Sequence, residues 1–328
     1  MQKKAAQSMR LLFSAALFAG SLNPVIVHAE ENTSYGDIDG DPIISITDLN
    51  VSRVEEAEPE TGSTSLTPAG EIEFINVIIE LEEPCVLDKG LVPGTPEAEA
   101  WSDHLVNVQN QITASAEKEM NVSEVNRTAP EGNRQAEHFT NVMNGMTMRI
   151  PAGMISMIKS ISGVKRVFEE ATYSAPKTEQ NEIEPMVNAV SDLIGTGSAY
   201  TGSYHSEGMV IGVLDTSLDV AHSAFSSEPE NPRISEEDVF EGIRAENAYV
   251  SSKIPFAYDY FDYDSDVVPE QNNENAIHGT HVSSIAAGKD HMITGIAPEA
   301  QIAFFKVFPD YEGSSSDSIL IRALEDSV

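Results

Sequence analysis

Apolar and polar positions form two regions of regular pattern, and the first covers residues 72 to 172. A strand is predicted for IEFINVIIEL, and a helix for WSDHLVNVQNQITASAEKEM, with Ser102 as its candidate N-cap. Two short strands or one bulged strand are predicted for HFTNVMNGMTMRI, a helix from Pro151 to Gly163, and a last strand for VKRVFEE. This order predicts a small α+β sandwich of the split β-α-β, ferredoxin-like type.

The second patterned region covers residues 208 to 328. Buried parallel strands are predicted for MVIGVLD and AQIAFFKVF, because both are continuous apolar runs. One helix is predicted from His278, and another for SDSILIRALEDSV. The second helix places four apolar residues partly on one face: Ile319, Ile321, Leu324 and Val328. The alternation of strand and helix predicts an α/β fold with a doubly wound parallel sheet.

The first 29 residues have the pattern of a secretory signal peptide. Small residues stand at the positions that a signal peptidase recognises, Val27 and Ala29. Basic residues precede the apolar stretch LLFSAALFAG: Lys3, Lys4 and Arg10. We expect cleavage after Ala29 and a secreted or cell-envelope location, with a short uncleaved anchor as the alternative. No other stretch is predicted to span a membrane.

Composition adds a strong acidic charge and two linkers. The 53 acidic and 19 basic residues give a net charge of −34, which repels phosphate backbones and anionic lipid and argues against nucleic-acid binding. The single cysteine, Cys85, excludes an intramolecular disulfide, and its place after an apolar run indicates a packed or idle thiol. Polar, turn-rich composition predicts linkers at residues 30 to 71 and 173 to 207.

Within the first linker, DIDGDPIISITD has the spacing of a twelve-residue calcium loop. Side-chain oxygens would stand at positions 1, 3, 5, 9 and 12, with the Ile43 carbonyl at position 7. The candidate ligands are Asp37, Asp39, Asp41, Ser45 and Asp48. Position 6 is Pro42, where such a loop takes glycine. Two interpretations stay open: a calcium site that resembles half of a dockerin module, and a solvated acidic turn.

Two residues of the second region have the potential for chemistry. Ligands of an open parallel sheet bind beyond the carboxyl ends of its strands. Asp215 ends MVIGVLD and His278 begins a helix after a loop, so both side chains can reach that edge. A carboxylate that accepts from one imidazole nitrogen fixes the tautomer and stabilises the imidazolium formed in catalysis. Gly279 is expected where the backbone passes close to a neighbouring loop.

The motifs around these residues, VIGVLDTSLDVAHSAF and HGTHVSSIAAG…GIAPEAQIAFFKVF, resemble the aspartate and histidine regions of subtilisin-like serine proteases, the subtilases. The resemblance covers roughly residues 185 to 328 and is strongest to the large cell-envelope members. It implies that Asp215 orients the base, that His278 is the general base, and that His281 has a structural role.

The rest of the family pattern is matched in part. Asp219 and His222 match the motif D-T-G-I-D-x-x-H, in which Ser217 and Leu218 replace Gly-Ile. The resemblance also implies a nucleophilic serine in a G-T-S-x-A motif and an oxyanion asparagine, and the 328 residues contain neither motif. The serine cluster GSSSDS, residues 313 to 318, is better explained as the N-cap of a helix. We therefore expect a fragment of a longer protease that is inactive as written.

Residues 72 to 172 resemble the inhibitory propeptide of this family. The resemblance implies that they template the folding of the catalytic domain, inhibit it, and are removed by a cut between about 173 and 190. An ordinary α+β accessory domain is the alternative. The prediction is a secreted serine endopeptidase precursor that acts on proteins or peptides, with its own propeptide as intramolecular inhibitor. A noncatalytic surface protein with a subtilase-like core and a free-standing protease inhibitor are the other two hypotheses.

Overall fold

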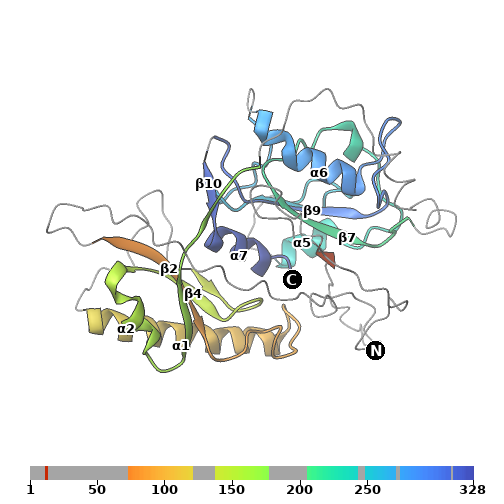
Figure 1. Ribbon diagram of the computed structural model, residues 1–328. Coiled ribbons are helices and arrows are strands. Elements are labelled where there is room, and N and C mark those ends of the chain that lie inside the picture. Colours follow the sequence, from red (N-terminus) through yellow and green to blue (C-terminus); the bar gives the residue numbers. More distant parts are fainter. Residues whose placement is uncertain are drawn as a thin grey trace, which may run out of the picture. The chain divides into compact units, whose positions relative to one another are not determined.

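The computed structural model of the chain (Figure 1) describes residues 12–13, 73–120, 137–176, 205–242, 248–270, 274–311 and 313–328. By contacts the chain divides into two units, residues 1–18 with 73–328, and residues 19–72. The second unit lies outside the described residues, as do the predicted signal peptide apart from β1 (Leu12–Phe13) and most of the second linker. No helix in the described part of the chain is long and apolar enough to cross a bilayer.

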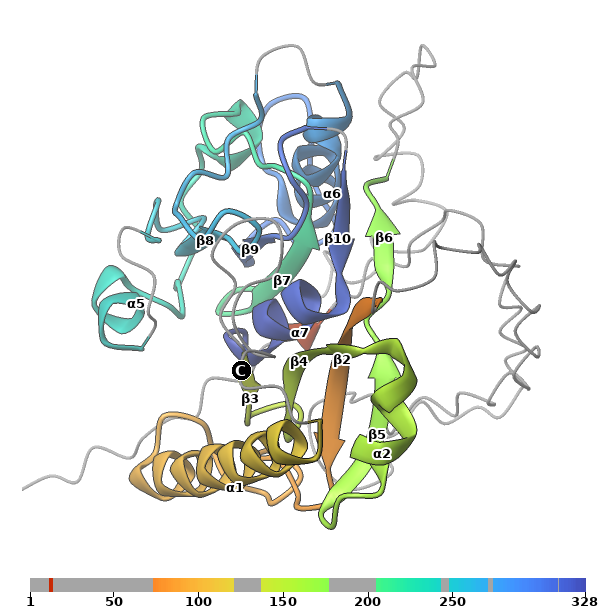
Figure 2. The same ribbon diagram turned by 90° about the vertical axis from the view of Figure 1, so that its left-hand side faces the viewer.

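Residues 73–176, here called the N-terminal module, form an antiparallel sheet with two helices (Figure 2). The sheet order is β3-β4-β2-β5, so the last strand lies beside the first. The elements follow as β2 (Phe74–Leu81), α1 (Pro96–Met120), β3 (His138–Phe139), β4 (Gly145–Pro151), a 3₁₀ turn (Ala152–Met154), α2 (Ile155–Lys159) and β5 (Val164–Glu169).

Both helices of the N-terminal module pack on one face of its sheet. Alternate residues of β2 and β4 face each other across the strands, as in the pairs Val77–Met148 and Ile79–Met146. These side chains share a core with residues from both helices: Ile112, Ala116 and Met120 of α1, and Ile158 of α2. Burial of this apolar surface holds the helices on the sheet.

Helix α1 begins at Pro96, five residues before the predicted segment, so the prediction of Ser102 as its N-cap is wrong. The Thr95 hydroxyl accepts a hydrogen bond from Ala98 N at 3.3 Å, and Pro96 takes the first helical position. Proline favours that position because its missing N–H would be unsatisfied there. The first turn, PEAEA, has no large apolar residue, and apolar spacing therefore could not reveal it.

Residues 205–328, here called the parallel-sheet module, contain the parallel strands in the order β7-β9-β8, with β1 beside β7. The strands are β7 (Val210–Asp215), β8 (Phe256–Asp259) and β9 (Gln301–Lys306), and the helices are α5 (Glu236–Gly242), α6 (His278–Ala287) and α7 (Asp317–Glu325). Two 3₁₀ turns lie at Ser223–Phe225 and Glu274–Ile277. The sequence pattern missed β8 and α5, which are short and lie in a polar, aromatic stretch.

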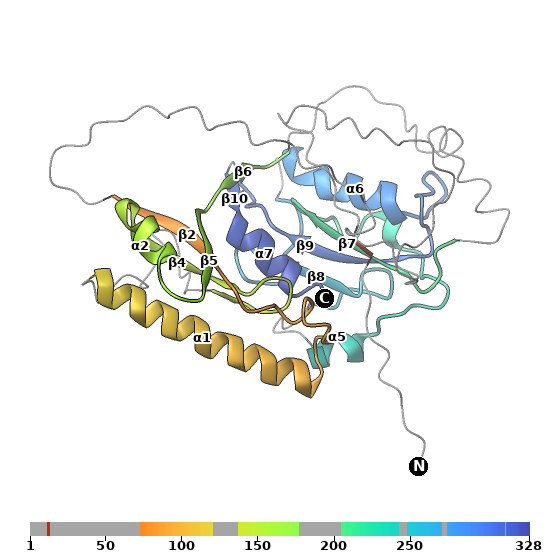
Figure 3. The same ribbon diagram turned by 60° about the horizontal axis from the view of Figure 1, so that its bottom comes forward.

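Helices cover both faces of this parallel sheet (Figure 3). Phe304 of β9 packs in one core with Ala287 of α6, and the next residue, Phe305, packs in another core with Ile319 and Ala323 of α7. Successive strand residues point to opposite faces, so one apolar run supplies both cores. The described strands and helices therefore have the doubly wound arrangement that the sequence predicts.

The end of the described chain differs from its prediction in two ways. Helix α7 ends at Glu325, before Val328, and its buried residues include Ser318 and Glu325, whereas Ile321 and Leu324 are half-buried. The preceding serines form a strand, β10 (Ser314–Ser316), and Ser316 stands at the N-cap position without a side-chain capping bond. Strand β10 pairs with β6 (Thr172–Ser174), which begins at the boundary of the predicted linker. These polar residues become strands because β6 and β10 pair with each other across the chain. A local sequence pattern cannot reveal pairing between such distant segments.

Candidate active site

Three charged residues stand in a row where the parallel strands end. Asp215 ends β7, Lys306 ends β9 and Asp259 ends β8, and the register pairs Asp215 with Lys306 and Lys306 with Asp259. The residues two positions earlier pack in the core beneath α6: Val213, Phe304 and Ala257. Because strand side chains alternate, the charged row lies on the same face of the sheet as α6.

At one end of the row, Asp215 contacts His278, the first residue of α6. His278 Nδ1 lies 2.8 Å from Asp215 Oδ1 and 3.0 Å from Oδ2, and Oδ1 also accepts from Thr216 N at 2.7 Å. The hydrogen bond that His278 donates to Asp215 raises the pKa of His278, although burial acts in the opposite direction. The carboxylate side chain is 4% exposed and the imidazole 30%. The predicted contact is therefore present, and the imidazole remains open to solvent.

The loop after β7 and the start of α6 are locked together around this contact. Thr216 Oγ1 donates to Ala276 O at 3.1 Å and accepts from Gly279 N at 3.1 Å. A Cβ atom on Gly279 would lie 2.6 Å from Ser217 O and 2.8 Å from the Phe304 ring. The expected close backbone approach at Gly279 is thus confirmed, and it lets α6 bring His278 to the carboxylate.

The other residues of the two motifs have structural contacts. Asp219 N donates to Thr280 Oγ1 at 2.8 Å, which ties the loop after β7 to α6 a second time. His222 Nδ1 accepts from Ala224 N at 3.2 Å and so caps the 3₁₀ turn that follows it. His281 is exposed on α6. None of these contacts involves the imidazole of His278.

At the other end of the row, a second ion pair is sealed inside the protein. The Lys306 ammonium contacts the Asp259 carboxylate and bonds Asp310 Oδ1 at 2.9 Å, and the Lys306 and Asp259 side chains are 0% and 1% exposed. Burial raises the pKa of Asp259 to about 6. Burial would lower the pKa of Lys306, but the bonds to Asp259 and Asp310 raise it above its usual value. Both members of the pair are therefore charged at neutral pH.

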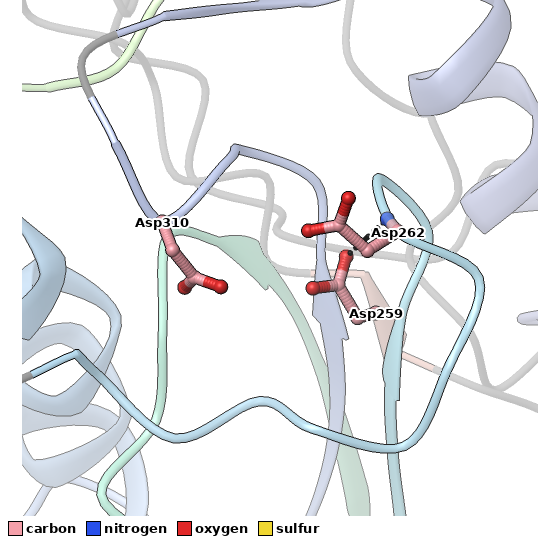
Figure 4. A group of neighbouring side chains, drawn as sticks. All are labelled: Asp259, Asp262 and Asp310. Carbon is pink, nitrogen blue, oxygen red and sulfur yellow. Dashed lines mark hydrogen bonds between the residues drawn. The ribbon is translucent and has the colours of Figure 1, made fainter. Parts of the chain in front are cut away.

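Three carboxylates of this region lie close enough to share a cation (Figure 4). Oxygens of Asp259, Asp262 and Asp310 all lie within 4.8 Å of one another, and Asp259 Oδ1 accepts from Asp262 N at 3.1 Å. Lys306 bonds two of the three, so a protein cation already offsets their charge. Sequence reasoning missed this cluster, although a lysine inside the apolar run AQIAFFKVF was an available signal.

Helix α7 carries a carboxylate that binds the backbone of the N-terminal module. Glu325 accepts hydrogen bonds from four successive N–H groups between β3 and β4: Thr140 at 2.8 Å, Asn141 at 2.8 Å, Val142 at 2.7 Å and Met143 at 3.3 Å. Nearby, Glu137 accepts from Tyr263 OH at 2.6 Å and from Arg322 at 2.9 Å. Burial raises the pKa of Glu325 despite these bonds. These contacts explain why a charged residue is buried on α7.

Two further sets of residues from the sequence prediction are the candidate calcium ligands and the serine cluster. The candidate calcium ligands lie outside the described residues, so calcium binding stays a prediction: Asp37, Asp39, Asp41, Ser45 and Asp48. The serine cluster forms β10 and the start of α7, with Ser315 and Ser316 buried.

Comparison with known proteins agrees with the geometry. Residues 206–328 match the model of the subtilase family. The PI-type proteinase of Lactococcus lactis subsp. cremoris is 25% identical over 269 residues, which cover 77% of this chain and 13% of the relative. The minor extracellular protease Vpr of Bacillus subtilis is 23% identical over 265 residues, which cover 76% of this chain and 28% of the relative. Residues 206–328 are therefore similar to the subtilase family, in agreement with the two motifs.

The remaining comparisons set the limits of this likeness. The PII-type proteinase of Lacticaseibacillus paracasei is also 25% identical over 269 residues, and the chain again spans 13% of its length. The solved structure of the epidermin leader peptide processing serine protease of Staphylococcus aureus superposes with a TM-score of 0.41 at 10% identity, and the match covers 77% of this chain and 47% of the other. The chain thus spans a small part of the proteinases it resembles in sequence.

Proposed function

We propose that the chain is the N-terminal part of a secreted or cell-envelope serine endopeptidase precursor, with His278 as general base and Asp215 as the residue that orients it. The observation that carries the proposal is the contact between a buried carboxylate and a half-buried imidazole at the carboxyl edge of a parallel sheet. The carboxylate accepts from Nδ1, so Nε2 is left to take a proton.

In this mechanism Nε2 of His278 removes the proton from a serine hydroxyl as the oxygen attacks a peptide carbonyl. Asp215 stabilises the imidazolium that results, and the imidazolium then gives its proton to the leaving amine. The raised pKa of His278 favours the protonated form that the step creates. The sequence Met1–Val328 contains no G-T-S-x-A motif, so the proposal requires the serine and the oxyanion donor from further sequence.

We further propose that the N-terminal module is an inhibitory propeptide of ferredoxin-like fold. Its strand order supports this role, as do the four N–H groups bound by Glu325 and the pairing of β6 with β10. Because β6 already pairs with β10, it would hinder a substrate peptide from pairing with the same strand.

The test uses the full-length gene product, in wild-type form and with His278→Ala or His281→Ala. We expect labelling by a serine-directed fluorophosphonate and peptide hydrolysis in the wild type. His278→Ala should lower kcat by roughly 10⁴-fold or more, since loss of a triad histidine in such enzymes costs on the order of 10⁶-fold. His281→Ala, one turn away on the same helix and exposed, should change kcat by less than about tenfold. Equal losses in the two variants, or a full-length protein with the serine motif that is never labelled, would contradict the proposal.

A further inference from the structure

One short segment already lies on the parallel-sheet module in the manner of a bound peptide. Strand β6 runs antiparallel to β10, with Thr172 opposite Ser316, Tyr173 opposite Ser315 and Ser174 opposite Ser314 (Figure 2). The three β6 residues are exposed, whereas Ser315 and Ser316 are buried. Strand pairing supplies affinity without regard to sequence, so any selectivity must come from side-chain contacts.

The first of these contacts joins Tyr173 to Asp317, the first residue of α7. Tyr173 OH donates to Asp317 Oδ1 at 2.7 Å, and Asp317 Oδ2 accepts from Ala171 N at 2.8 Å. The hydrogen bond to Asp317 raises the pKa of Tyr173 to about 12, so the phenol keeps its proton. Asp317 thus uses one oxygen on the peptide backbone and the other on a side-chain donor.

The second contact has the opposite polarity. Glu170, three residues before Tyr173, accepts from Ser318 N at 3.1 Å and from the Ser318 hydroxyl. Ser318 lies in the first turn of α7, where unpaired N–H groups and the helix dipole favour a negative charge. The first turn of α7 therefore offers a donor to residue 170 and an acceptor to residue 173.

We propose that Asp317 and Ser318 determine which peptides bind along β10. They select a segment with a carboxylate at one position and a hydrogen-bond donor three residues later, either a phenol or a basic side chain. This inference rests on the proposed function, because it takes β10 as an edge that binds peptide substrates. Phenylalanine at the later position would leave Asp317 Oδ1 without its donor, and a site built for a donor rejects such an analogue.

The first experiment measures how strongly β6 is held on β10 in this chain, and it does not require enzymatic activity. Amide hydrogen exchange of Thr172–Ser174 is compared for wild type, Tyr173→Phe, Tyr173→Lys, Asp317→Ala and the double variant Tyr173→Phe with Asp317→Ala. We expect Tyr173→Phe to speed exchange about tenfold, a size that fits a hydrogen bond to a charged but partly solvated group. Tyr173→Lys should stay within about threefold of wild type. Tyr311→Phe, at another exposed tyrosine, is the matched control and should change nothing.

A double-mutant cycle decides whether Asp317 is the group responsible. In the Asp317→Ala background, the amides of Thr172–Ser174 should exchange at the same rate whether residue 173 is tyrosine or phenylalanine. A tyrosine preference that persists without Asp317, or no preference in the wild type, would overturn the proposal. Circular dichroism of each variant checks its fold, and Asp317→Asn keeps an acceptor if the alanine variant unfolds.

The second experiment uses the full-length enzyme freed of its N-terminal module. Peptides that contain EATYSAP, EATFSAP and AATYSAP are compared by kcat/KM. We expect the first to be favoured about tenfold over each of the others, and Asp317→Ala to abolish only the preference over phenylalanine. Equal kcat/KM values would refute selection by α7, even if the exchange cycle had shown coupling in the tail. Coupling in the cycle together with no hydrolysis of any peptide would instead count against the proposed function.

Discussion

Two carboxylate–cation pairs lie at the same edge of the parallel sheet and differ in how they are assembled. Asp259 and Lys306 end neighbouring strands, so their register brings them together. Asp215 meets His278 across a loop and the start of α6, which requires the close backbone approach at Gly279. The first pair is sealed, whereas the second leaves its imidazole 30% exposed.

This difference separates a structural charge from a reactive one. The Lys306 and Asp259 side chains are closed off from solvent, so they cannot exchange protons with a substrate. Burying this pair becomes costly to stability when one member is removed and the other is left unpaired. An imidazole that reaches solvent, as that of His278 does, can accept and return a proton. The comparison predicts that changes at Lys306 act on stability and that changes around His278 act mainly on chemistry.

The largest effect on stability is expected for Lys306→Met. Loss of the ammonium leaves the buried Asp259 unpaired, and this should lower the free energy of unfolding by about 3–5 kcal/mol in urea titrations followed by circular dichroism. Lys165→Met is the control: Lys165 is 56% exposed, and its partner Glu80 keeps Arg166. It should cost less than about 1 kcal/mol.

A second variant tests whether the unpaired charge of Asp259 causes the predicted loss of stability. Adding Asp259→Asn to Lys306→Met removes the unpaired charge and keeps an oxygen for the N–H groups of Phe261 and Asp262. The double variant should therefore be more stable than Lys306→Met alone. If it is less stable, the loss comes from packing and the account of a sealed ion pair is wrong.

An intermediate effect is expected for Gly279→Ala. The new Cβ would collide with Ser217 O and with the Phe304 ring, so α6 must move away from β7. We expect a loss of about 1–3 kcal/mol in unfolding free energy. Gly153→Ala, where nothing lies within 4 Å of the new atom, should leave stability nearly unchanged or raise it slightly. Equal stability of the two variants would show that the Asp215–His278 contact does not depend on this close approach.

The smallest effect on stability is the pH dependence of the open pair. The hydrogen bond that His278 donates to Asp215 raises the folded-state pKa of His278 above its unfolded value. The pair therefore stabilises the fold fully below the unfolded pKa, and this contribution is lost as the pH rises through the folded pKa.

Titration of the His278 ring protons by NMR checks this reasoning. Asp215→Asn should lower the pKa of His278, because burial then acts without the opposing carboxylate. The same spectra should show His281 below its usual pKa, because partial desolvation and the nearby imidazoles of His278 and His222 disfavour its charged form. A pKa of His278 that does not respond to Asp215→Asn would mean that the contact is not an ionic one in solution.

Local pattern identified the parts of the molecule that are regular and buried. Strands β7 and β9 are apolar runs, and Asp215 and His278 stand at their element ends, so the edge of a parallel sheet could be inferred from the chain alone. Strand β8, at four residues, and β6 and β10, at three residues each, are too short or too polar to give a periodic signal. The prediction of Ser102 as the cap of α1 failed because apolar spacing begins one turn after the helix does.

The sequence by itself determined the strand and helix ends that carry the aspartate and the histidine, because hydrophobic period and motif spacing are local properties. Only the tertiary structure decided three other interactions. They are the buried ion pair of Lys306, the hydrogen bonds of Glu325 to the N-terminal module, and the contact of Asp317 with Tyr173. Each of these joins charged or polar groups from segments far apart in the chain. A buried charge is tolerated only where its partner is supplied, and the fold determines that supply.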